Sequence, residues 1–160
     1  MRCVTTAIVA LIGAVAVATA LVTSVRAQTV QELEPLSFGT FVVTSNAAAS
    51  TLTVPLNGAV SSTGNLIVLV PGNRARYRVG GLPGNTIVGI DINSLPLFGA
   101  TVPASQFFQI TAFSHPLTVT TNASGEAIFF VGATLSTSGN GVPYTNNTYT
   151  GMIDITATLQ

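Results

Sequence analysis

The last twelve residues of the chain alternate in side-chain type along their whole length. One side carries Tyr149, Gly151, Ile153, Ile155, Ala157 and Leu159, and the other carries Thr150, Met152, Asp154, Thr156, Thr158 and Gln160. A β-strand points successive side chains to opposite faces, whereas a helix would scatter these residues around its circumference. The pattern predicts a half-buried strand over residues 149–159.

Further apolar segments recur at short spacing, separated by turns rich in Gly, Pro and Asn. Such spacing is typical of a β-sandwich or barrel, and nine short strands in one domain imply two packed sheets. After residue 27, no segment has the apolar period of a helix. The sequence therefore predicts an all-β, two-sheet antiparallel sandwich with strands over residues 36–44, 51–56, 66–70, 75–79, 86–92, 107–113, 117–120, 126–135 and 149–159.

The alternation also predicts which side chains face the core. The inward positions are Leu52, Val54 and Leu56, then Tyr77 and Val79, then Val88, Ile90 and Ile92. The segment 126–135 differs because both of its faces are apolar, with Phe129 on one and Ile128 and Phe130 on the other. Such a strand needs cover on both sides, which a loop or another subunit could supply.

Residues 1–27 have the pattern of a secretory signal peptide, expected to form an N-terminal signal helix. Arg2 supplies the positive start, an apolar run follows, and small residues at Val25 and Ala27 suit signal peptidase. Cleavage would leave one domain, residues 28–160. The alternative is an uncleaved membrane anchor, since the uncharged span 3–25 is long enough to cross a bilayer. We expect a secreted protein, in the periplasm or on the cell surface, whose only membrane contact is this segment.

Composition narrows the range of partners. Cys3 is the only cysteine and lies in the signal segment, so the remaining chain has neither a disulfide nor a thiolate metal site. There is no lysine, and after residue 27 three arginines stand against five acidic side chains. This balance argues against nucleic acid as a partner. A surface of Ser, Thr, Asn and Gly is typical of an extracellular protein that packs against copies of itself.

Arg74, Arg76 and Arg78 form the main charged pattern, because a spacing of two places them on one face of a strand. The ridge could bind acidic glycan or lipid headgroups, since guanidinium groups pair well with carboxylate and phosphate. It could also be a solvated outer face that protects the sheet from aggregation. In a third interpretation it pairs with Glu32 and Glu34, which lie two apart, within the chain or across subunits.

Catalytic chemistry has little support in this sequence. His115 is the only histidine and has no Ser, Cys or carboxylate motif beside it, which favours a structural role. Asp91, Glu126 and Asp154 are the acids available for a glycosidase pair, but there is no tryptophan to stack a sugar. We therefore predict no enzyme activity, no cofactor and no metal.

Three segments resemble the bacterial domain-of-unknown-function family 4402: Leu36-Ser37-Phe38-Gly39-Thr40-Phe41-Val42-Val43, Gly132-Ala133-Thr134-Leu135 and Tyr149-Thr150-Gly151. Through that family the chain is similar, more distantly, to spore-coat-U-type and chaperone–usher pilin subunits. The resemblance implies an immunoglobulin-like, pilin-like sandwich on a Gram-negative cell surface. It also implies that an N-terminal segment completes the sheet of the next subunit, with a periplasmic chaperone as a further partner.

Two functional hypotheses follow. In the first, the protein is a structural or adhesive subunit that binds copies of itself or other surface subunits by β-strand complementation. Its expected interface residues are Val30, Glu32, Leu33 and Glu34, although alternation puts Val30 and Leu33 on opposite faces and residues 28–35 precede the first predicted strand. In the second, the protein is a monomeric binding module that holds an acidic glycan or lipid on Arg74, Arg76 and Arg78.

Overall fold

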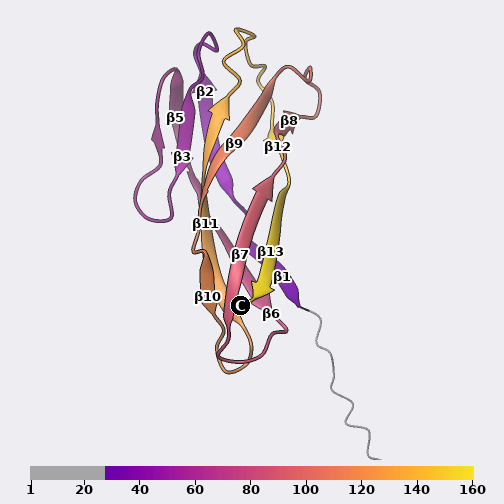
Figure 1. The fold of residues 1–160 in the computed structure, drawn as a ribbon. Coiled ribbons are helices and arrows are strands. Elements are labelled where there is room, and N and C mark those ends of the chain that lie inside the picture. Colours follow the sequence, from indigo (N-terminus) through magenta and orange to yellow (C-terminus); the bar gives the residue numbers. More distant parts are fainter. Residues whose placement is uncertain (1–27) are drawn as a thin grey trace, which may run out of the picture.

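The computed structural model describes residues 28–160, so the predicted signal peptide lies outside the described residues. The all-β prediction is confirmed, because every element of the described part is a strand and every ladder is antiparallel. Nothing in residues 28–160 forms a helix of the length and hydropathy that a membrane crossing requires. The strands build an elongated molecule with the first strand and the C-terminus at the same end (Figure 1).

The first layer is an eight-stranded sheet. Its path runs β1, β6, β11, β9, β8, β12, and β3 and β4 extend it beside β11. The bounds are β1 Thr29–Glu34, β3 Thr51–Val54, β4 Ser61–Ser62, β6 Ala75–Gly80, β8 Leu97–Gly99, β9 Phe107–Ser114, β11 Ala127–Thr137 and β12 Tyr149–Thr150.

Strand β11 organises this sheet and runs nearly the length of the molecule (Figure 1). Its first half pairs with β6 and its second half with β3, and the change of partner falls at Gly132. A side chain at that position would collide with the carbonyl oxygen of Val54 and would lie within 3.0 Å of the backbone of Pro55 and Leu56. Glycine therefore lets β3 end against β11, which gives the Gly132 segment a structural role.

The second layer consists of two separate ladders. One has the order β10 (Thr118–Thr120), β7 (Ile87–Ser94), β13 (Ile153–Leu159), and the other pairs β2 (Ser37–Val43) with β5 (Leu66–Asn73). The single second sheet expected from the sequence is thus divided.

Each ladder of the second layer covers its own hydrophobic core. The lower core of Figure 1 joins β6, β7, β11 and β13, and the upper core joins β2, β3, β5, β9 and β11. The predicted inward residues of β3, β6 and β7 are buried, while Leu56 lies past the end of β3 and is half-buried. The lower core contains Ala75, Tyr77, Val79, Leu82, Val88, Ile90, Ile92, Phe129, Val131 and Ala157. The upper core contains Phe38, Leu52, Val54, Leu66, Phe108, Ala133 and Leu135.

The predicted strand over 149–159 is two strands. Residues Gly151 and Met152 leave the ladder, so β12 pairs with β8 in the first layer and β13 with β7 in the second. The Leu95 amide donates to the Met152 carbonyl at 3.1 Å, and this bond keeps the segments around these two residues side by side between the two layers. The alternation of side chains continues through the break, and this is why sequence periodicity does not reveal it.

Candidate functional site

A groove of about 810 Å³ lies between β2 of the second layer and residues 144–153. All of β2 lines one side, and residues 144–153 line the other. In the described chain, β2 pairs with β5 alone, β12 with β8 alone and β13 with β7 alone. Each of these strands therefore has one edge whose backbone groups make no ladder hydrogen bonds. An added strand in the groove could pair with the free edge of β2, and on the opposite wall it would meet β12 and the first residue of β13, Ile153.

Aromatic rings build the floor of the groove. Phe108 is buried at the centre, stacked on Tyr144 with ring centroids 4.2 Å apart and edge-on to Tyr149 at 4.8 Å and Phe41 at 5.4 Å. The Tyr144 hydroxyl donates to the Phe107 carbonyl at 2.6 Å, and the Tyr149 hydroxyl donates to the Thr145 carbonyl at 3.0 Å. These bonds hold both rings in place and satisfy their hydroxyl groups.

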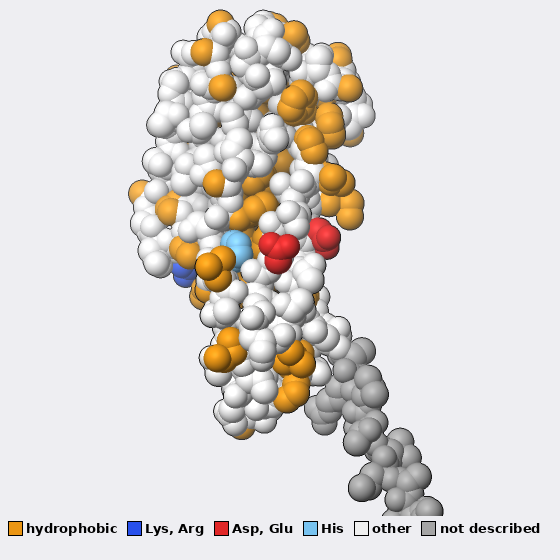
Figure 2. Space-filling view, viewed as in Figure 1, with side chains coloured by type: hydrophobic (Ala, Val, Ile, Leu, Met, Phe, Trp, Pro, Cys, Tyr) orange, Lys and Arg blue, Asp and Glu red, His pale blue; other side chains and the backbone are white. Residues whose placement is uncertain are grey.

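Among residues 28–160, no charged side chain lines this groove. Burial, followed by the neighbouring Tyr144, raises the pKa of the Tyr149 hydroxyl, so Tyr149 stays neutral at physiological pH. The rim carries the amides and hydroxyls of residues 145–148. Figure 2 shows that charged side chains are also sparse over the face it displays. An occupant that carried an unpaired charge inward would find no partner here.

The predicted interface residues lie on β1, a strand that the sequence did not predict. All six residues of β1 are exposed, and the strand pairs with β6 of the same chain. A register shift between Glu32 and Glu34 makes Leu33 an extra residue in the ladder. The regular alternation of side chains, which would put Val30 and Leu33 on opposite faces, is therefore interrupted at Leu33.

The same shift separates the two glutamates. Glu32 lies opposite Tyr77 and accepts a hydrogen bond from its hydroxyl at 3.0 Å, while Glu34 lies opposite Arg76 with an N–O distance of 3.5 Å. Burial first, and then the hydrogen bond and charge of Glu32, raise the pKa of Tyr77 to about 12. Within one chain, the predicted pairing with the arginine ridge is made by Glu34, whereas Glu32 contacts Tyr77 instead, and pairing across subunits stays a prediction.

The three arginines share one face of β6, as predicted, but each already has protein partners. The guanidinium of Arg74 lies 3.9 Å from the centroid of the Phe130 ring and donates to the Leu56 carbonyl. Arg78 donates to Gln31 at 2.6 Å and pairs with Glu126 at 3.6 Å. These contacts neutralise much of the ridge. Binding of an acidic ligand to it stays a prediction that no contact in the structure favours.

Arg74 also covers part of the second apolar face of β11. Its side chain lies over Phe130, which is half-buried, whereas Ile128 is 48% exposed. The cover expected from a loop or another subunit therefore comes in part from a cation–π contact with the neighbouring strand.

Of the other candidate residues, Asp91 and Asp154 are diagonal neighbours on one face of the β7–β13 ladder, because Asp91 lies opposite Thr156 and Asp154 lies opposite Asn93. Nδ1 of His115 lies 3.0 Å from the carbonyl oxygen of the adjacent Pro116. Asp91 and Asp154 are exposed on β7 and β13, and Glu126 lies beside Arg78. Among residues 28–160 there is no cluster of three His, Cys, Asp or Glu side chains suited to a metal ion.

These observations define the class of the protein: an all-β, double-layered antiparallel domain with an uncharged groove between two unpaired strand edges. A sequence profile described as "Domain of unknown function (DUF4402)" matches residues 28–158, and the chain belongs to this family. Comparison with curated proteins and with solved structures gave no match.

Proposed function

We propose that the protein is a secreted structural or adhesive subunit of the bacterial cell surface that assembles by β-strand complementation. The groove between β2 and residues 144–153 is the observation that carries this proposal. A strand from another surface subunit would pair with the free edges and would cover the aromatic floor. This is strand addition at an exposed sheet edge, in which main-chain hydrogen bonds supply much of the affinity.

The chemistry of the groove specifies the inserted strand. Because the lining is uncharged and centred on Phe108, the inward side chains of that strand should be apolar or small and neutral. Strand β1 of another copy is a poor match, since Glu32 and Glu34 would meet no arginine in the groove. In the chain's own fold these residues contact Tyr77 and Arg76.

The test uses charge placed at the rim of the groove. Val42 and Met152 line it, and both side chains are exposed, at 43% and 72%. The double variant Val42→Arg with Met152→Arg should keep the fold and lose assembly, because charged side chains along a sheet edge oppose the addition of another strand. Assembly is measured as SDS-resistant, heat-dissociable ladders in surface extracts of cells that express the full-length chain.

The matched control is Leu117→Arg. Leu117 is 76% exposed and lies outside the groove lining, so the same substitution there should leave the ladders intact. Ladders that persist unchanged in the double variant would refute the role of the groove, and complete absence of ladders in the wild type would refute assembly itself.

A further inference from the structure

Strand β1 differs from every other long strand of the described chain because it adds little to either core. Its residues are all exposed, and both Val30 and Leu33 remain 36% exposed. Val30 and Leu33 each cover about two-thirds of their surface, but neither belongs to the lower or the upper core. Its attachment to β6 depends on the backbone ladder and on side-chain contacts.

Those contacts are specific and cross from one strand to the other. Glu32 binds Tyr77, Gln31 binds Arg78 and Glu34 pairs with Arg76. Beyond this ladder, the Gln28 side chain donates to the carbonyl of Ala157 on β13. A β6 strand in any copy of the chain presents the same Arg76, Tyr77 and Arg78, and can therefore make the same contacts with another copy's β1.

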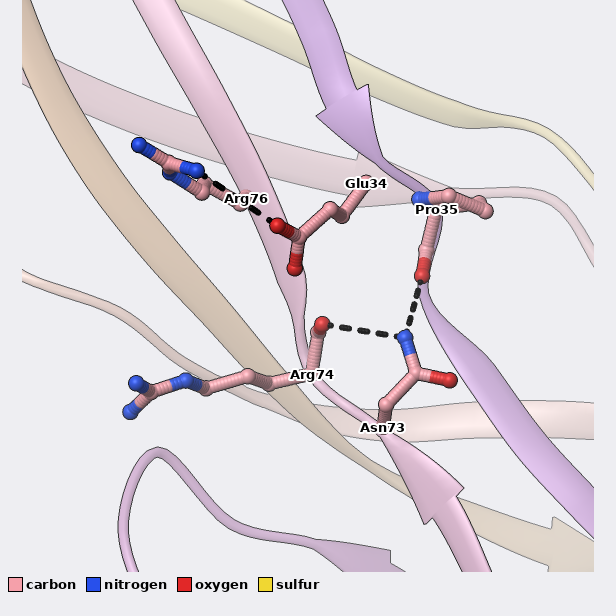
Figure 3. A network of polar contacts seen from close by, with 5 residues as sticks. All are labelled: Glu34, Pro35, Asn73, Arg74 and Arg76. Carbon is pink, nitrogen blue, oxygen red and sulfur yellow. Dashed lines mark hydrogen bonds and ion pairs between the residues drawn. The ribbon is translucent and has the colours of Figure 1, made fainter.

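The connection from β1 to β2 favours an arm that can open. Only Pro35 and Leu36 lie between the two strands. Proline restricts its own φ and biases the preceding Glu34 toward extended backbone. Figure 3 shows the contacts that hold this corner, where Asn73 donates to the Pro35 carbonyl at 3.0 Å beside the Glu34–Arg76 pair. Short connections of this kind are where strand exchange between copies begins.

We propose that β1 is an exchangeable arm that passes between two copies of this chain and docks on the β6 edge of the partner copy. The exchanged arm keeps each contact that it makes within its own chain, so the two states differ little in free energy and concentration decides between them. This contact uses the β6 edge and not the groove. It is a separate interface from that of the proposed function and does not depend on it.

Charge reversal distinguishes exchange from pairing within one chain. In Glu34→Arg the arm faces its own Arg76 with like charge, and in Arg76→Glu two carboxylates face each other. A mixture of the two variants restores opposite charges at both positions only when the arms are exchanged. We expect native mass spectrometry of the mixture, expressed from full-length chains, to show a severalfold excess of the mixed dimer over either homodimer.

The double variant that carries both Glu34→Arg and Arg76→Glu in one chain is the matched control. It restores the pair internally, so it should show no more dimer than the wild type. Equal dimer content in the mixture, in each single variant and in this control would overturn the proposal.

A covalent trap supplies a second measurement at a position away from the ion pair. Gln31 and Arg78 lie directly opposite each other, and residues 28–160 contain no cysteine. Chains with Gln31→Cys and chains with Arg78→Cys, both carrying Cys3→Ser, should form a mixed disulfide dimer when they are combined under oxidising conditions. If only the chain with both cysteines closes its internal disulfide, and no mixed dimer forms, β1 does not exchange.

Discussion

The two halves of the molecule share strand β11 but differ in how their second layer is closed. In the lower half, three paired strands cover the core. In the upper half, the two strands β2 and β5 leave a groove of about 810 Å³ over Phe108. The arginines lie along β6 in the lower half, whereas no charged side chain lines the groove. The same strand chemistry therefore builds a closed double layer at one end of the molecule and an incomplete one at the other.

The largest expected effect comes from removing one aromatic ring in each half. Phe129 and Phe108 are both 2% exposed, and Phe→Ala substitutions in cores cost about 3–5 kcal/mol. We expect Phe129→Ala near the upper end of that range and Phe108→Ala near the lower end. The space that Phe108 leaves would open into the groove, whereas the space that Phe129 leaves would be enclosed in the lower core. Urea unfolding of the two variants measures the difference, and a larger loss for Phe108→Ala would contradict an open upper half.

The junction between the halves is tested at Gly132. A methyl group there would collide with the backbone at the end of β3, so Gly132→Ala should destabilise the fold by about 1–3 kcal/mol. Gly80→Ala is the control, because its nearest neighbours would lie at ordinary contact distances of 3.7 Å or more. Equal unfolding midpoints for the two variants would show that β3 does not end against β11 in this way.

Tyr77 gives the lower half a dependence on alkaline pH. Its pKa is raised from 10.0 to about 12 in the folded chain, so the folded state retains the proton that the unfolded state releases first. This contribution to stability is complete below pH 10 and is lost as the pH rises through about 12. Tyr77→Phe should flatten the dependence of unfolding free energy on pH in that window. An unchanged slope would contradict the burial of the Tyr77 hydroxyl together with its contact to Glu32.

The smallest expected effects on stability are those of replacing Arg76 and Arg74 on the arginine ridge. Arg76→Ala removes an exposed ion pair and should cost about 0–1 kcal/mol. Arg74→Ala removes the side chain that covers the Phe130 ring, so it should lower the free energy of unfolding by more than Arg76→Ala does. Thermal unfolding of both variants at low and high salt ranks them, and only the Arg76 loss should shrink with salt.

Local sequence patterns predicted the strands well but not how they pair. The inward residues of β6 and β7 follow directly from alternation, and their burial confirms them. Strand β1 escaped prediction because its polar side chains give no apolar period, and the register shift at Leu33 interrupts the alternation. The break after β12 escaped because Gly151 and Met152 keep the period of two while the chain changes layer.

The groove could not have been predicted from local patterns, because it depends on which strand edges remain unpaired. That property depends on how the fold places β2 relative to residues 144–153, which lie more than one hundred residues away in the sequence. The aromatic floor has the same origin, since Phe41, Phe108 and Tyr149 come together only in the fold. The family resemblance, by contrast, came from the segments 36–43, 132–135 and 149–151, and in the first two the close approach of backbone at Gly39 and Gly132 excludes a side chain.

Hydrogen–deuterium exchange at the two groove edges tests the central claim most directly. The amides of residues 37–43 and 149–153 are compared between the monomeric protein and the assembled protein extracted from the cell surface. If a strand completes the second layer, amides on both edges exchange much more slowly in the assembly, while exchange in β7 hardly changes. Equal exchange at these edges in both states would contradict the account.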